Sequence, residues 1–308
     1  MQWRLHIKGA DDLQGELSLA RLATFEASAI IQPLVALAAK VIQEHHGEVF
    51  FDGCVFGNEF CEHLLPSAAS LRQALAAAQS RNLAFTLLTP YVGNEGITAL
   101  RPLFDALAEQ AGNEVVFNDW GVLNLLRRDY PTLRPVQGRL LNKSLRDPRV
   151  TTMYAAAPAP ASALNVLQGS NLDNASYAMM LRRFGVEMIE MDNLPQGNDL
   201  NVGGLAIAIY LPFGFISTSR VCMAAGLHYH KADKFQPGAP CRHECQTHLL
   251  EYQYTNSPFG NRDQKFYLKG NSYFYHHSEP MLRALPAQAA QGRIARLIFQ
   301  PRLPMIAI

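Results

Sequence analysis

Residues 83–117, LAFTLLTPYVGNEGITALRPLFDALAEQAGNEVVF, hold a complete strand, helix and strand in that order. The apolar run at residues 83–88 predicts a strand, which Thr89 and Pro90 end. Apolar residues then recur at steps of three and four from Ile97, which is typical of an amphipathic helix. Residues 114–117 predict the next strand. Because such a unit joins parallel strands, the stretch predicts an α/β fold.

The same alternation continues on both sides of this stretch. The other predicted helices occupy residues 27–43, 66–80, 120–128, 172–184 and 281–291. The other predicted strands occupy residues 3–7, 48–51, 134–137, 186–189, 205–210, 213–217, 266–268, 272–275 and 295–299. The number of strands favours a (β/α) barrel-like domain over a doubly wound sheet.

Residues 138–163 interrupt this alternation with charged residues and closely spaced prolines, which predict a long loop or linker. The final third is loop-rich and contains most of the Cys and His. We expect one (β/α)-barrel-like domain over residues 1–308. The alternative is a first β/α half at residues 1–137 and a second half, with the cysteine-rich segment, at residues 164–308.

Composition excludes several classes of protein. The chain has 308 residues, 48% of them hydrophobic, so it is not intrinsically disordered. Its 27 Lys and Arg against 26 Asp and Glu argue against a generally basic nucleic-acid binder. The N-terminus alternates apolar and polar residues without a signal-peptide core, and no apolar run is long enough to span a bilayer. The expected compartment is the cytoplasm.

Cysteines form the sharpest chemical pattern. The segment CRHEC places Cys241 and Cys245 close enough to share one metal, and Cys222 lies upstream. Cys61 follows the second predicted strand. In a β/α barrel the segments after the strands gather on one face, so these four thiols can converge on an iron–sulfur cluster or zinc. Cys54, at the end of a predicted strand, is expected to be a core thiol.

Two other interpretations of the cysteines remain open at this point. Free cysteines are commonly small buried hydrophobic residues without a ligand. Zinc is the other alternative, because His248 follows Cys245 closely and His228 and His230 lie in the same segment. An odd number of cysteines argues against a disulfide framework.

Four segments together resemble the collagenase-like peptidase family, the U-thirty-two group, and its short UbiU- and UbiV-like members in particular. The similarity extends over roughly residues 48–250. The segments are NDWGVL at 118–123, GRLLNK at 138–143 with RDPR at 146–149, STSRVC at 217–222 and CRHEC at 241–245.

This resemblance implies a barrel-like domain and a 4Fe–4S cluster held by Cys61, Cys222, Cys241 and Cys245. It also implies oxygen-independent hydroxylation of an aromatic or quinone precursor, as in ubiquinone biosynthesis, with prephenate as the oxygen source. A paralogous partner subunit is expected. Peptidase activity is not expected, because no catalytic triad and no H-E-x-x-H motif stands out.

Three residues are candidates for catalysis. Arg220 could hold a substrate carboxylate by a two-pronged hydrogen bond, or form a structural ion pair or donate to cluster sulfur. Asn118 and Asp119 follow a strand, where barrel enzymes place active groups, although Asp119 could instead cap a helix.

Other polar and aromatic residues receive simpler interpretations. Arg139, Arg146 and Arg149 form either a patch for an anionic substrate or a solvated surface. The pairs at residues 45–46 and 276–277 are expected to be exposed histidines. Four tyrosines are assigned to sheet packing: Tyr252, Tyr254, Tyr267 and Tyr273.

The sequence therefore supports two functions of different classes. The first is an iron–sulfur component of an oxygen-independent hydroxylase that acts on a small anionic or aromatic substrate. The second is a non-catalytic protein with a structural four-cysteine metal site. RNA hydroxylation is a third interpretation, which the near-zero net charge does not favour.

Overall fold

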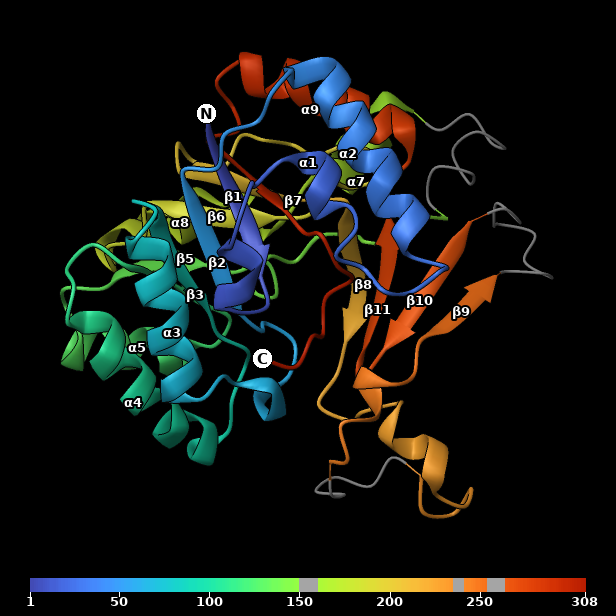
Figure 1. Cartoon of the computed structure of the whole chain (residues 1–308). Coiled ribbons are helices and arrows are strands. Elements are labelled where there is room, and N and C mark those ends of the chain that lie inside the picture. The colour runs from blue at the N-terminus through green and yellow to red at the C-terminus, as the bar shows by residue number, and fades with distance from the viewer. Residues whose placement is uncertain (150–159, 235–240, 254–263) are drawn as a thin grey trace.

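The computed structural model describes residues 1–149, 160–234, 241–253 and 264–308. Parallel strands close into a barrel in the order β1-β12-β7-β6-β5-β4-β3-β2, which confirms the predicted barrel (Figure 1). The barrel strands are β1 (Gln2–Ile7), β2 (Gly53–Gly57), β3 (Ala84–Leu88), β4 (Glu114–Phe117), β5 (Arg134–Gln137), β6 (Met188–Met191), β7 (Ala206–Leu211) and β12 (Arg296–Phe299).

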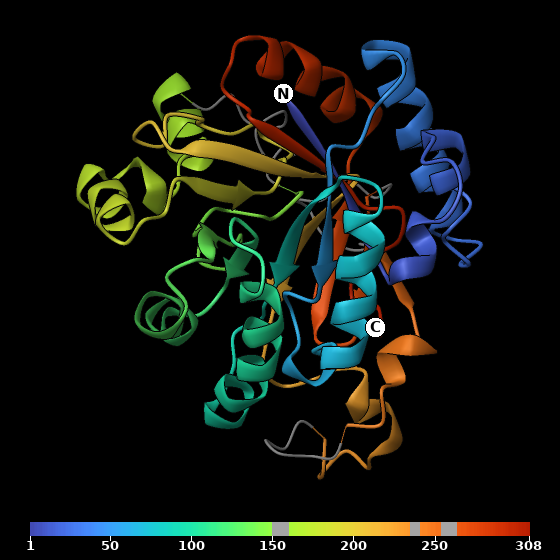
Figure 2. The same ribbon diagram turned by 60° about the vertical axis from the view of Figure 1, so that its left-hand side comes forward.

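Helices surround the barrel and cover the outer side of its strands (Figure 2). They are α1 (Leu19–Leu22), α2 (Gln32–His46), α3 (Ala68–Gln79), α4 (Asn94–Ala108), α5 (Trp120–Asp129), α7 (Ala161–Gln168), α8 (Ala175–Arg183) and α9 (Glu279–Ala290). Helix α4 buries Leu100, Phe104 and Leu107, which is the apolar face that the sequence predicts. None of the helices in the described ranges is both long enough and apolar enough to cross a membrane.

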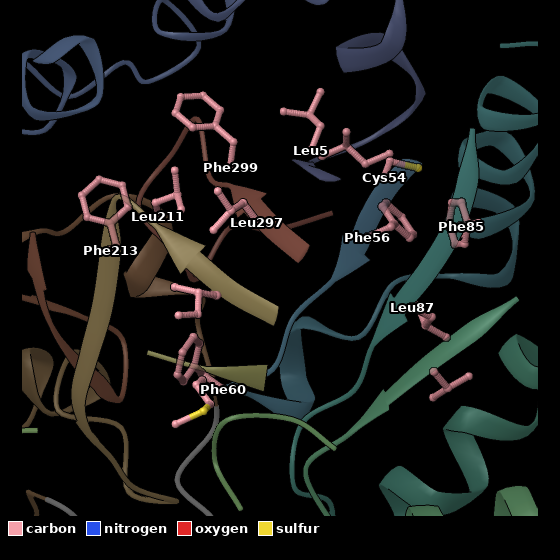
Figure 3. Packing of buried hydrophobic residues seen from close by; sticks show 14 of the residues in the cluster. Leu5, Cys54, Phe56, Phe60, Phe85, Leu87, Leu211, Phe213, Leu297 and Phe299 are labelled. Atoms are coloured by element: carbon pink, nitrogen blue, oxygen red, sulfur yellow. The ribbon is translucent and has the colours of Figure 1, made fainter. Parts of the chain in front are cut away.

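Two hydrophobic clusters lie on opposite sides of the barrel wall. The inner one fills the barrel with side chains that include Val55, Val116 and Ile298. The outer one joins strands to helices, and Figure 3 shows Leu5 and Phe56 among its members. Because successive side chains of a strand point to opposite sides, neighbouring residues of one strand, such as Val55 and Phe56 of β2, belong to different clusters.

A salt bridge closes the amino-terminal end of the barrel. Arg296 donates to both carboxylate oxygens of Glu114, at 2.7 and 2.9 Å, and Thr86 donates to the same carboxylate. These contacts lower the pKa of Glu114, although its burial acts in the opposite direction. The barrel is therefore packed at this end with paired charges rather than open.

A second sheet follows β7 and stands beside the barrel (Figure 1). Its order is β8-β11-β10-β9 and all of its neighbours are antiparallel. Phe60, which follows β2, packs edge-on against Phe215 and Phe274 of this sheet, with ring centroids 5.5 and 5.1 Å apart. The strands are β8 (Phe213–Thr218), β9 (Leu250–Gln253), β10 (Lys265–Lys269) and β11 (Ser272–His276).

The predicted second strand is wrong. Residues 48–51 are not a strand, and β2 begins at Gly53. Val49 is buried but Phe50 is 74% exposed, so the apolar run at 48–51 is only partly buried and forms no strand. A Cβ at Gly53 would lie 2.6 Å from the carbonyl oxygen of Ala84 in β3. The absence of a side chain at Gly53 therefore allows β2 to lie this close to β3.

Smaller differences concern element bounds. Helix α2 starts at Gln32 rather than at residue 27, and α8 starts at Ala175, after a short 3-10 helix, η3 (Asn171–Asp173). Strand β9 was not predicted. Part of the predicted loop at 138–163 and Tyr254 lie outside the described residues. The division of the chain into domains stays a prediction.

Candidate functional site

Four cysteines from three separate segments come within electrostatic reach of one another. Cys61 follows β2, Cys222 follows β8, and Cys241 and Cys245 precede β9. Burial and, to a smaller extent, the charges of the three other cysteines raise the pKa of Cys61 to about 12. Cys222 and Cys241 both act on the pKa of Cys245, and Cys241 acts on that of Cys222. Every pair among the four thiols therefore interacts.

Three of these sulfur atoms also have N–H donors. The backbone N–H of His63 hydrogen-bonds Cys61, and those of Ala224 and Ala225 hydrogen-bond Cys222. The side chain of Gln246 donates to the sulfur of Cys245 at 3.0 Å. Hydrogen bonds to sulfur favour the thiolate form and are typical of iron–sulfur and zinc sites.

The four thiols are of the right chemical type to ligate a metal, although their side chains are not grouped closely enough to form a metal site. Across the described ranges, no three His, Cys, Asp or Glu side chains are grouped as a metal site. Burial raises the pKa of Cys61, Cys222 and Cys245, so these thiols are protonated at neutral pH. A metal would have to displace those protons and bring the sulfurs closer together.

The histidines named for the zinc alternative have other contacts. His228 lies 3.8 Å from the carboxylate of Glu244, and its ring centroid is 6.0 Å from that of His248. The ring of His248 hydrogen-bonds the Glu244 carbonyl oxygen at 3.2 Å, and His230 is exposed. These contacts hold the short helix η5 (Glu244–Gln246), which carries Cys245.

Arg220 lies beside the cysteine site and has no carboxylate within ion-pair distance in the described part of the chain. It donates to the Val92 carbonyl oxygen at 3.3 Å, and its guanidinium lies 5.5 Å from the centre of the Tyr91 ring. The charge of Cys61 acts on the pKa of Tyr91, which burial raises. Tyr91 is a site neighbour that the sequence analysis did not identify.

Asn118 and Asp119 both make structural contacts at the end of β4. The Asn118 amide donates to the Thr89 carbonyl oxygen at 2.9 Å and accepts from the Leu140 N–H at 3.0 Å. Asp119 accepts from the Gly121 N–H at 2.7 Å and so caps α5. These contacts explain both residues without a reaction, and their catalytic role stays a prediction.

We expect Asp119→Ala to lower the free energy of unfolding by about 1 kcal/mol, because α5 loses its N-terminal cap. Asp119→Asn keeps a capping oxygen and should be nearly neutral. Chemical denaturation of both variants checks this. A normally stable Asp119→Asn protein without activity would instead assign the carboxylate to catalysis.

A buried ion network crosses the carboxyl end of the barrel. Arg139 is fully buried and holds Glu59 by two nitrogens, the shorter contact being 2.7 Å. It also donates to Asp192 at 2.8 Å, and Arg146 donates to the other oxygen of Asp192 at 2.8 Å. The Arg139 guanidinium stacks 4.0 Å from the centre of the Tyr210 ring.

This network corrects the interpretation of the arginines. Arg139 and Arg146 form neither a solvated surface nor a free patch for an anion, because carboxylates inside the fold pair with both. Arg149 is half-buried and pairs with its neighbour Asp147. Sequence reasoning did not identify Glu59 or Asp192, since nothing in the local pattern distinguishes them from exposed acids.

Two further polar groups lie inside the protein. Tyr210 donates to one oxygen of Glu190 at 2.9 Å, while burial and the charge of Glu59 raise the pKa of Glu190 well above its usual range. His277 is buried, which lowers its pKa to about 3, and His276 is half-buried. The expectation of an exposed pair at 276–277 is therefore wrong. Tyr267 is buried as expected, whereas Tyr252 is 42% exposed.

Known proteins resemble this chain only distantly. No family model and no curated protein matches the chain. The structure is similar to that of the U32 peptidase Mk0906, with a TM-score of 0.42 and 11% identity over 97% of this chain and 92% of that one. YKL-39, crystallised with chitooligosaccharides, has a TM-score of 0.27 and 9% identity over 97% and 92% of the two chains. The Ostrinia furnacalis Group II chitinase catalytic domain 2 has a TM-score of 0.20 and 12% identity over 97% of this chain and 70% of that one.

Proposed function

We propose that the chain is an iron–sulfur protein in which Cys61, Cys222, Cys241 and Cys245 hold a 4Fe–4S cluster. The observation that supports this is the mutual interaction of four thiols from three segments, three of them with N–H donors to sulfur. Buried cysteines that served only as packing residues would not need to converge from such distant parts of the sequence.

We further propose that the protein takes part in oxygen-independent hydroxylation of an aromatic or quinone precursor, together with a paralogous subunit. The cluster would supply one-electron transfer. Arg220 would bind a carboxylate of a small anionic substrate such as prephenate, because its guanidinium has no acidic partner among the described residues. The Tyr91 ring beneath it would fix its orientation.

The buried network has a supporting role in this proposal. Glu59 lies two residues before Cys61, and Arg139 fixes it to the barrel. The sulfur of Cys61 is thereby held at the carboxyl edge of the strands, where barrel enzymes bind their substrates.

The proposal predicts about four irons and four sulfides per chain after purification without oxygen. The double variant Cys241→Ser/Cys245→Ser should lose both, together with the visible absorption. Cys54→Ala is the matched control, because Cys54 is a buried cysteine within β2 and should leave the cluster intact.

Metal analysis separates the alternatives. Zinc without iron would replace the redox proposal with a structural site. The absence of both metals would mean that the cysteines are packing residues. If the cluster is present, the hydroxylation proposal is tested by an anaerobic assay with prephenate and the partner subunit. A cluster-loaded complex that transfers no oxygen atom to any aromatic or quinone acceptor would contradict it.

A further inference from the structure

The turn between β10 and β11 contains no cysteine, yet it contacts the segments that carry them. The side chain of Asn271 is buried and donates to the Phe60 carbonyl oxygen at 2.8 Å and to the Ser219 carbonyl oxygen at 2.6 Å. Phe60 directly precedes Cys61, and Ser219 lies three residues before Cys222. One amide group thus links two cysteine segments.

The other contacts of this amide fix its orientation, and its nitrogen also donates to the Tyr91 hydroxyl at 3.3 Å. Its oxygen accepts a hydrogen bond from the Ser272 hydroxyl at 2.9 Å, which leaves the nitrogen facing the two carbonyl groups. The backbone carbonyl of Asn271 also accepts from the Ser219 N–H at 3.2 Å. Among the described residues, no other donor is bonded to the carbonyl oxygen of Phe60 or of Ser219.

The neighbouring glycine reaches the third segment. Gly270 has a φ of +63°, and a Cβ built on it would lie 3.1 Å from the Cβ of Cys245. Its carbonyl oxygen accepts from the Ala224 N–H at 3.1 Å, two residues after Cys222. The turn is therefore packed on Cys245 while it is bonded to the other two segments.

We propose that Asn271 is the positioning residue of the cysteine site. This inference rests on the proposed function, because it assigns Asn271 to the assembly of the same four-thiol centre. Asn271 acts through main-chain groups next to Cys61 and Cys222 and does not itself ligate. Without these N–H bonds the two carbonyl groups lose the donor that they share, so the Cys61 and Cys222 segments are held less firmly, by packing such as that of Phe60 against Phe215.

The first test compares Asn271→Ala and Asn271→Asp with Asn113→Ala. Asn113 is a matched control, because it is also buried and its amide also donates to two main-chain carbonyl oxygens, those of Leu107 and Gln110. Asp at position 271 keeps the size and the bond from Ser272 but has no N–H to donate. Both Asn271 variants should lose iron affinity by about 10- to 100-fold. Asn113→Ala should keep the iron affinity of the wild type, although its thermal stability falls by a similar amount.

A second readout needs no metal. In metal-free protein, a short bifunctional thiol reagent should link Cys61 to Cys222, as detected by mass spectrometry of peptides. The link should persist in Asn113→Ala and be lost in both Asn271 variants. If Asn271→Ala does not fold, Asn271→Asp carries the comparison.

The outcomes separate the two proposals. Wild-type iron affinity and intact cross-linking in a folded Asn271 variant overturn the positioning role. A wild-type protein that takes up no iron, but whose cross-link depends on Asn271, overturns the proposed function and supports the positioning role.

Discussion

Arg139→Met is expected to lower the free energy of unfolding by about 3–5 kcal/mol, because it leaves Glu59 in the protein interior without its countercharge and Asp192 with Arg146 alone. Arg139 is fully buried between Glu59 and Asp192, and it makes a further hydrogen bond to the Phe213 carbonyl oxygen at 3.3 Å. Methionine restores some of the packing volume but none of these bonds. A domain of ordinary stability would lose a large fraction of its margin.

The loss of stability caused by Arg139→Met should depend on pH. Burial, the largest influence, raises the pKa of Glu59, and the charge of Arg139 opposes this. Removing the arginine raises that pKa further, so the folded variant prefers the protonated carboxyl. A raised pKa in the folded state contributes stability at low pH that is lost as pH rises, so the deficit should shrink as the pH is lowered.

Denaturant titrations of wild type, Arg139→Met and Arg128→Met make the comparison. Arg128 is an exposed arginine that pairs with Asp129 on α5, so its replacement should have no measurable effect. Equal stabilities of the two variants at neutral pH would mean that the buried network does not hold the end of the barrel together.

The strand and helix pattern was predictable because it depends on local spacing. The run at residues 83–88 and the helical spacing of Leu100 and Phe104 both correspond to observed elements. The second strand was misplaced because β2 depends on a close approach between Gly53 and Ala84, which lies in another strand. No periodicity within residues 48–57 encodes that distance.

Candidate site residues could be named from the sequence only where the chemistry is visible in the residue type. Cysteines are rare, so four of them could be proposed as ligands, and that assignment stays a prediction. Arg139 and Glu59 are 80 positions apart, and Asn271 is 211 positions from Phe60. Such pairings follow from barrel closure and from the packing of the second sheet. A charge or an amide in sequence does not indicate which partner the fold brings to it.

The second large effect is expected at Gly57, the last residue of β2. Its φ of +114° is a conformation that L side chains rarely adopt, and a Cβ there would lie 2.5 Å from the Leu88 carbonyl oxygen. Gly57→Ala combines backbone strain with a clash against the neighbouring strand. We expect a loss of about 3–5 kcal/mol in the free energy of unfolding.

Gly112→Ala separates strain from contact. Gly112 has a similar φ of +92°, but a Cβ there would meet no atom within 4 Å. Its variant should therefore lose only the strain, about 1–2 kcal/mol. Denaturant titration of both variants gives the difference, which measures the clash with β3.

The clash introduced by Gly57→Ala should also displace Cys61 in the cysteine site. The carbonyl oxygen of Gly57 is within 3.3 Å of the His6 ring, and Glu59 and Cys61 follow directly. Relief of the contact with Leu88 requires the end of β2 to move, and that movement carries the Cys61 sulfur with it. Folded Gly57→Ala protein should show weaker cross-linking of Cys61 to Cys222 than Gly112→Ala. Identical cross-linking, or equal stability of the two variants, would show that β2 accommodates the methyl group and that its close contact with β3 does not position Cys61.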